Sequence, residues 1–229
     1  MRARELHDWD VSTAEARQLQ EGLAGRVRLK PLPLRLGFVA GADVSFSREL
    51  GVVFAALLVF QLDKMELVEQ ALADAPACFP YVPGLLTFRE GPAVLRAFGK
   101  LHRKPHAVIF DGQGYAHPRR IGLASHMGLW LGLPTVGCAK SRLIGEHAEP
   151  GLRRGDFTEL LDSGEQIGVA LRTRDSVKPV FVSPGHLADF ASSVRLVLEC
   201  CRGYRLPEPT RQAHITVERW KRSRMLQGG

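Results

Sequence analysis

The stretch FDGQGYAHPRRIGLASHMGLWLGLPTVGCAKSRL, residues 110–143, decides the fold of this chain. An apolar run over 107–110 delivers Asp111 to its carboxyl end, a helix-like segment follows, and a second apolar run leads to Lys140. This order predicts two parallel strands joined by a crossover helix. Ligands of open α/β sheets bind beyond the carboxyl ends of such strands. Asp111 and Lys140 are therefore expected to lie in one site.

Three strand-like runs precede this unit, and their short connections make them antiparallel neighbours. Ser12 and Glu15 form a capping box before the first helix, and Thr87 is the expected cap of the second. The expected strands cover 36–46, 52–61, 66–75, 107–111, 134–139, 166–172 and 179–183. The expected helices cover 13–23, 88–101, 119–132 and 187–201, with a final helical segment after Pro209.

The order of these elements indicates one mixed α/β domain. No internal repeat and no linker divides residues 1–229, and the polar stretch 145–164 is expected to be loop with short strands. Three antiparallel strands followed by parallel strands, flanked by helices, describe a ribonuclease H-like sheet.

Composition limits the class of protein. The 229 residues are 45% hydrophobic, which suffices for a core, and the net charge of +7 favours a polyanionic partner. No apolar run is long enough to cross a bilayer, and the polar N-terminus lacks the apolar stretch of a signal peptide. Without zinc-site spacing, the cysteines are expected to be buried thiols of a reducing, cytoplasmic protein. They are Cys78, Cys138, Cys200 and Cys201.

Three acids are candidates for a metal site. Asp43 follows the small and apolar residues 38–42, where an unpaired carboxylate would be costly, although it could also cap a turn. Glu90 is expected in a first helical turn, where it could simply complement the helix dipole. Asp111 precedes a glycine, as in many turns. Brought to one sheet edge, the three would repel each other unless Mg²⁺ or Mn²⁺ bound between them, as suits phosphodiester hydrolysis.

Each of the basic candidates has both a functional and a structural interpretation. Lys140 could hold the attacking water or neutralise the phosphate, or it could be a solvated strand-end lysine. Arg119 and Arg120, at a predicted helix start, could contact phosphate or only solvent. The histidines His117 and His214 could be functional or structural.

The loop PYVPG, residues 80–84, is stiffened by two prolines around Tyr81. An aromatic ring at the tip of a rigid loop can wedge into a base stack and replace a flipped base. The alternative is a tyrosine folded back onto the core.

Taken together, these motifs resemble endonuclease V, the nuclease that acts at deoxyinosine. The resemblance extends over about residues 36–214. It rests on GADVSF at 41–46, PYVPGLLTFRE at 80–90, DGQGYAHPRRIGLASHMGL at 111–129, PTVGCAKSRL at 134–143, SPGH at 183–186 and PTRQAH at 209–214.

The resemblance implies a ribonuclease H-like, Mg²⁺-dependent DNA repair endonuclease in which Mn²⁺ can substitute. Such an enzyme hydrolyses the second phosphodiester on the 3′ side of deoxyinosine and leaves 3′-hydroxyl and 5′-phosphate ends. The implied metal ligands are Asp43, Glu90 and Asp111. His214 would lie close to the metal, and Lys140 and His117 would assist at the scissile phosphate.

For recognition, the resemblance makes Tyr81 the wedge, with Pro80 and Val82 beside it. The implied pocket for the flipped base is formed by Gly84, Leu86, Gly112, Gly122 and Leu143. The expected partner is damaged DNA, single- or double-stranded, bound by a monomer. Residues 218–229 fall outside the motifs and are expected to form a flexible basic tail.

Two other hypotheses remain open at the level of sequence. The same core could cut inosine-containing RNA, flaps or mismatches. Alternatively, the chain could be a basic nucleic-acid-binding module whose acids are structural.

Overall fold

The strand that carries Asp43 lies inside the sheet. In the computed structural model, which describes residues 1–227, β1 (Phe38–Ser47) pairs antiparallel with β2 (Val52–Gln61), and β2 pairs antiparallel with β3 (Glu66–Pro76). On its other side β1 pairs parallel with β4 (Ala107–Phe110), which pairs parallel with β5 (Thr135–Ala139). The predicted antiparallel meander and parallel crossover unit are both confirmed.

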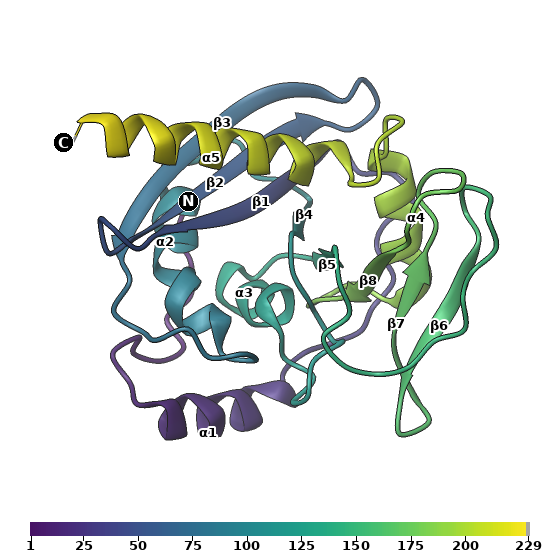
Figure 1. Ribbon diagram of the computed structural model, residues 1–229, viewed down its shortest axis with the longest axis horizontal. Coiled ribbons are helices and arrows are strands. Elements are labelled where there is room, and N and C mark those ends of the chain that lie inside the picture. Colours follow the sequence, from purple (N-terminus) through teal and green to yellow (C-terminus); the bar gives the residue numbers. More distant parts are fainter. Residues whose placement is uncertain (228–229) are drawn as a thin grey trace.

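Three more strands extend the sheet beyond β5. The order β3-β2-β1-β4-β5-β8-β7-β6 places β3 and β6 at opposite ends (Figure 1). The predicted hairpin is confirmed as β7 (Glu165–Leu171) and β8 (Val180–Pro184), which are antiparallel. Within the stretch expected to be mainly loop, β6 (Phe157–Asp162) pairs with β7.

Helices cover both faces of the sheet. On one face lie α2 (Leu86–Lys100) and α3 (Leu123–Leu131), and on the other lie α4 (Phe190–Cys200) and α5 (Glu208–Gln227). Side chains alternate along β2, so Val53, Ala55 and Leu57 pack toward α2 and α3, whereas Phe54, Ala56 and Leu58 pack toward α4 and α5. This burial on both faces explains why β2 reads as an unbroken apolar run.

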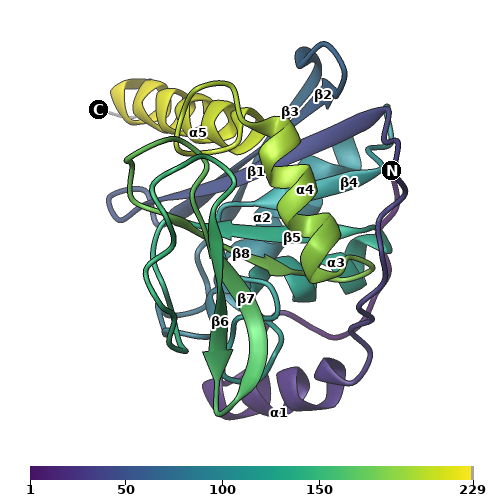
Figure 2. The same cartoon turned by 90° about the vertical axis from the view of Figure 1, so that its right-hand side faces the viewer.

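The helix α1 (Thr13–Ala24) lies outside the sheet, below it in Figures 1 and 2. The predicted capping box is present, with Ser12 and Glu15 bonding each other's backbone N–H groups. Apolar residues of α1 pack against the loop that precedes α2 and against the segment that leads into α3. This helix therefore supports the loops at one edge of the sheet.

Two predicted helix starts are wrong. The helix α2 begins at Leu86, its N-cap Leu85 makes no side-chain capping bond, and Thr87 is buried inside the first turn. The helix α3 begins at Leu123 instead of residue 119, because Arg120 has a φ of 56°, which no right-handed helix accommodates.

The predicted flexible tail is also wrong for residues 218–227, which continue α5; residues 228–229 lie outside the described part. The Trp220 ring meets Phe54 edge-on, with ring centroids 4.9 Å apart. Lys221 donates to the Ser45 hydroxyl at 2.7 Å, and Glu218 bonds the same hydroxyl. These distant contacts on β1 and β2 order a segment that reads as basic tail in the sequence.

The cysteines are only partly as predicted. Cys138, Cys200 and Cys201 are buried, but Cys78 is exposed because it lies in the loop just after β3. Among residues 1–227 there is no helix long and apolar enough to span a membrane.

Glycine at position 41 allows α5 to lie against β1. A Cβ atom built on Gly41 would come within 2.1 Å of the Pro209 carbonyl carbon and 2.5 Å of the Thr210 nitrogen. Both neighbours are backbone atoms at the start of α5, so a side chain could fit only if the helix moved. The position of α5 on the sheet therefore depends on this glycine.

We expect Gly41→Ala to lower the free energy of unfolding by roughly 1–3 kcal/mol, because the added methyl group overlaps backbone atoms of α5. Gly22→Ala is the matched control, since a Cβ atom there meets nothing within 4 Å in helix α1. That change should stabilise the fold by roughly 0.5–1 kcal/mol. Urea denaturation measures both variants, and equal stabilities would contradict the close approach of α5.

Candidate active site

The pairing of β1 with β4 brings two carboxylates together. The register places Ala42 opposite Phe110, and the Asp111 N–H donates to the Ala42 carbonyl oxygen at 3.1 Å. Because the strands are parallel, the residues that come next, Asp43 and Asp111, lie side by side where β4 ends. The juxtaposition predicted for these two acids is therefore present.

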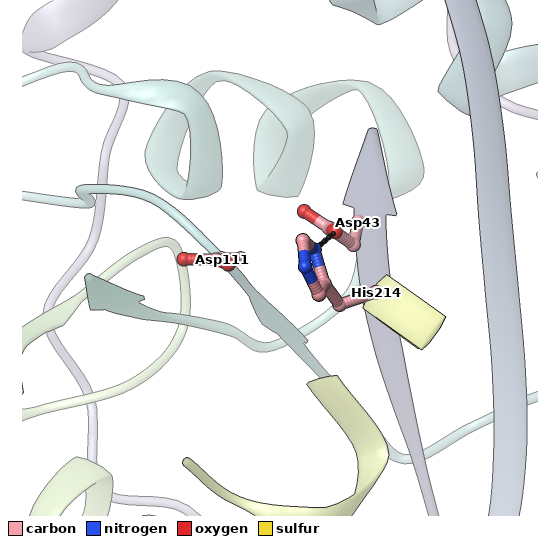
Figure 3. A group of neighbouring side chains, drawn as sticks. All are labelled: Asp43, Asp111 and His214. Carbon is pink, nitrogen blue, oxygen red and sulfur yellow. Dashed lines mark hydrogen bonds and ion pairs between the residues drawn. The ribbon is translucent and has the colours of Figure 1, made fainter. Parts of the chain in front are cut away.

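Helix α5 adds an imidazole to this pair. The Nδ1 atom of His214 lies 2.7 Å from Asp43 Oδ2. Possible ligand atoms of Asp43, Asp111 and His214 all lie within 4.8 Å of one another (Figure 3). Two carboxylates and one imidazole in such a space can hold a divalent cation.

Burial of the carboxylates makes this site favourable for a cation. Only 9% of the Asp43 side chain and 12% of the Asp111 side chain are exposed. Burial and the charge of Asp111 raise the pKa of Asp43 to about 6, against the lowering effect of its bond with His214. A bound cation would offset the repulsion that raises this pKa.

Glu90 completes the acidic site but stands apart from the compact group. It lies on α2 and is not among the residues whose ligand atoms converge within 4.8 Å. Burial raises its pKa to about 8, and the charges of Asp43 and Asp111 add to this shift. The charges of the other two acids therefore reach the third predicted carboxylate. In the compact group, however, His214 is the third member.

Lys140 places a positive charge next to Asp111. It directly follows β5, and its Nζ atom lies 2.5 Å from Asp111 Oδ2. Its side chain is 41% exposed, so the ammonium group faces both the carboxylate and solvent. The prediction that Lys140 and Asp111 share one site agrees with this geometry.

A cavity of about 360 Å³ opens beside these residues. Glu90, Asp111 and Lys140 belong to its wall. The wall also contains every residue predicted for the base pocket, namely Gly84, Leu86, Gly112, Gly122 and Leu143. The cavity therefore connects the predicted pocket to the acidic site.

The predicted wedge residue stands at the rim of this cavity. Tyr81 is 69% exposed and contributes to the cavity wall, so it is not folded back onto the core. Its two predicted neighbours are placed differently. Val82 packs toward Phe79 and Phe88, while Pro80 is exposed and does not line the cavity.

The remaining predicted site residues contact other residues of the protein and not the acidic group. Arg120 pairs with Asp162 at 2.8 Å and with Glu165 at 2.7 Å, so a phosphate would have to compete with two carboxylates. His117 is buried and Arg119 is half-buried, and both bond the Gly84 carbonyl instead of joining the acidic group. Burial also lowers the pKa of His117 to about 4, so its ring is neutral at physiological pH.

One residue of this region was missed by sequence reasoning. Gln20 of α1 is 1% exposed, and it also bonds the Gly84 carbonyl. A glutamine within an amphipathic helix carries no local signal of such a role, because its partners are 64 or more residues away in the chain.

Fold and site together define a ribonuclease H-like nuclease with a divalent-metal site. The sequence profile of the Endonuclease V family matches residues 21–215 of the chain. The chain belongs to the endonuclease V family and is an endonuclease. A non-catalytic binding module is therefore no longer supported.

Individual relatives agree with this assignment. The Endonuclease V of Methanothrix thermoacetophila is 52% identical over 225 residues, which are 98% of each chain. The crystal structure of Endonuclease V from Streptomyces avermitilis is 43% identical, with a TM-score of 0.91 over 95% of this chain and 96% of that one. Endonuclease V of Ciona intestinalis, 26% identical with a TM-score of 0.80, was crystallised with a 24mer DNA containing an inosine followed by a ribo-adenosine; the match covers 92% of this chain and 98% of that one.

The raised pKa of Glu90 predicts how stability depends on pH in metal-free buffer. Between the ordinary value of 4.5 and the folded value of about 8, the folded protein binds more protons than the unfolded chain. The free energy of unfolding contributed by Glu90 therefore falls as pH rises through this window. Glu90→Gln removes this loss, so above a pH of about 8 the variant should be more stable than the wild type by on the order of 2 kcal/mol.

Thermal denaturation across this pH range, with a chelator present, measures the effect. Glu159→Gln, at an exposed position of β6, is the control and should leave the pH profile unchanged. Parallel profiles for wild type and Glu90→Gln would contradict the raised pKa of Glu90.

Proposed function

We propose that this endonuclease is a Mg²⁺-dependent DNA repair enzyme that cuts at deoxyinosine. It hydrolyses the second phosphodiester on the 3′ side of the lesion and leaves 3′-hydroxyl and 5′-phosphate ends. The observation that carries the proposal is that the acidic site and the cavity share residues. Glu90, Asp111 and Lys140 belong both to the acidic site and to a cavity of about 360 Å³, which lies in the size range of small-molecule pockets. A base in this cavity would place its own strand beside the acids.

The residues of the site divide the chemical work. Asp43 and Asp111 would hold the ion, with His214 and Glu90 next to them. Once bound, Mg²⁺ polarises a phosphoryl oxygen and lowers the pKa of water. The Lys140 ammonium group would neutralise charge that develops on the phosphate.

His214 would donate a proton to the leaving group. Cleavage that leaves a 3′-hydroxyl group requires a proton on the departing 3′ oxygen. Asp43 holds the Nδ1 atom of His214 and so directs the other ring nitrogen, Nε2, away from the carboxylate. The side chain is 46% exposed, which allows Nε2 to meet a substrate oxygen.

Recognition would require the damaged base to leave the stack. Enzymes that carry out chemistry on a single base turn it out of the duplex into a pocket, and a cavity that receives the lesion would require the same movement. Tyr81, exposed at the cavity rim, would fill the vacated position, and Pro80 and Val82 would set its backbone. The inosine-containing DNA bound by the Ciona intestinalis relative supports this class of substrate.

The function is tested by incubating the protein and Mg²⁺ with matched oligonucleotides that carry inosine or adenine, made as DNA and as RNA. We expect a nick at the second phosphodiester 3′ to inosine in DNA. Mapping the product ends measures the position. Equal cleavage of the adenine and inosine strands would refute the proposal, and cleavage of the RNA strand alone would change the substrate class.

Removing either carboxylate should abolish nicking. For Asp43→Ala and Asp111→Ala we expect a loss of on the order of 10³-fold or more in kcat, with DNA binding retained because repulsion of phosphate is removed. Asp63→Ala, in the turn between β2 and β3, is the control and should remain active. Substantial turnover by Asp111→Ala with Mg²⁺ would rule out this site.

The wedge residue is tested separately. Tyr81→Ala should reduce the preference for inosine over adenine more than it alters the dependence on Mg²⁺, because the ring stacks on bases and does not contact the metal site. Tyr81→Phe keeps the ring and should keep the preference. Competition between labelled inosine and adenine strands measures it. If Tyr81→Ala retained the full preference, the wedge assignment would be wrong.

A further inference from the structure

The chain leaves the sheet at Lys140, directly after β5. The last residue pair between β5 and β8 joins Ala139 to Phe181, and Lys140 and Pro179 follow and precede it. The pairing of β5 with β4 ends two residues earlier, at Gly137. Pro179 has no N–H group, so it cannot donate a further backbone bond to the neighbouring strand. The backbone at Lys140 therefore lies beyond the strand pairing on both sides.

The side chain of Arg205 bonds both chain segments at this point. Arg205 lies in the loop between α4 and α5. Its Nη2 atom donates to the Lys140 carbonyl oxygen at 2.6 Å and to the Pro179 carbonyl oxygen at 2.8 Å. Its Nε atom donates to the Lys178 carbonyl oxygen at 3.0 Å. One guanidinium group therefore joins the segment after β5 to the segment before β8, where their own pairing has ended.

Arg205 is itself held in place. Its carbonyl oxygen accepts a hydrogen bond from the Thr173 hydroxyl group at 2.6 Å, and Thr173 is 2% exposed. The arginine is half-buried, and a guanidinium group is planar and donates in fixed directions. An arginine fixed at its backbone in this way also fixes the carbonyl groups that it bonds.

The position of the Lys140 ammonium group depends on this backbone. The Nζ atom lies 2.5 Å from Asp111 Oδ2, at the end of a flexible four-carbon stem. Because 41% of the side chain is exposed, packing restrains the stem only in part. Gln113 donates to the next carbonyl oxygen, that of Ser141, at 2.9 Å, whereas Arg205 bonds the carbonyl of Lys140 itself. Loss of Arg205 would therefore free the point from which the lysine side chain starts.

We propose that Arg205 is a positioning residue for catalysis: by bonding the Lys140 carbonyl, it holds the Lys140 ammonium group beside Asp111. The inference rests on the proposed function, in which Lys140 neutralises charge on the phosphate, and deepens it. Arg205 acts through Lys140 and not on the base. Its removal therefore slows the chemical step and leaves the preference for inosine unchanged.

Arg205→Met removes all the side-chain donors and keeps an unbranched chain. We expect the single-turnover rate constant on inosine DNA, at saturating enzyme, to fall by roughly tenfold to hundredfold, because a small misplacement of a catalytic group costs on that order. The affinity for the same DNA should not change. Arg205→Lys keeps the charge and one donor nitrogen, so it should lose less of the rate than Arg205→Met.

A double-mutant cycle separates positioning from a general loss of stability. Lys140→Met removes the ammonium group through which Arg205 acts. In that background Arg205→Met should cause no further loss of rate, whereas a general loosening of the fold would slow both backgrounds by the same factor.

A matched control is available on α4. The Nη2 atom of Arg195 also bridges two backbone carbonyls, those of Leu32 at 3.2 Å and Pro33 at 2.9 Å, and this arginine is half-buried as well. Arg195→Met should leave the rate unchanged. A crystal structure of Arg205→Met adds a measurement that does not depend on activity, and we expect Lys140 Nζ to lie beyond hydrogen-bond distance from Asp111.

The outcomes distinguish the inference from the proposed function. If Lys140→Met were as fast as the wild type, the proposed role of Lys140 would be overturned, and the positioning with it. A slow Lys140→Met beside a fully active Arg205→Met would overturn the positioning alone. An equal fall of the rate in both backgrounds would do the same, as would a crystal structure of Arg205→Met in which Lys140 keeps its contact with Asp111.

Two further measurements keep the inference testable. If Arg205→Met does not fold, Arg205→Lys takes its place in the cycle and in the crystal structure. If Lys140→Met is too slow to measure, the position of Lys140 in the crystal structure decides the question.

Discussion

Repulsion between two buried carboxylates is the constraint on which this active site depends. The parallel pairing of β1 and β4 puts Asp43 and Asp111 side by side where β4 ends. His214 and Lys140 each contact one of these acids, at 2.7 Å and 2.5 Å. Even so, burial and the charge of Asp111 keep the pKa of Asp43 raised to about 6, and a bound cation would lower it.

Other elements of the fold bring charged groups from distant segments to these two acids. His214 arrives on α5, whose path across β1 requires a position without a side chain at Gly41. Contacts of Trp220 and Lys221 hold the far part of the same helix on β1 and β2. On the other side of the acids, helix α1 reaches the cavity wall through Gln20. The acidic group and the loop around Gly84 are thus supported by separate sets of contacts.

Sequence reasoning worked where the signal was local. Alternation, turn residues and the crossover rule predicted the strands around Asp43, Asp111 and Lys140, because adjacent residues decide each of those features. It failed where a distant partner decides the outcome. Arg120 reads as a phosphate contact until β6 and β7 supply Asp162 and Glu165. Glu90 and His214 could not be ranked as members of the compact group, since that depends on how helices pack on the sheet. Residues 218–227 read as a tail because their partners lie on β1 and β2, more than 150 residues earlier.

The most direct test of this account is the position of a bound ion. Crystals soaked in Mn²⁺ and measured near the manganese absorption edge would locate the metal by its anomalous signal. We expect a peak between the carboxylates of Asp43 and Asp111 and within ligand distance of both, and its absence in Asp111→Ala. A peak elsewhere on the protein, or no peak at Mn²⁺ concentrations that support cleavage, would contradict the claim that these two acids form the metal site.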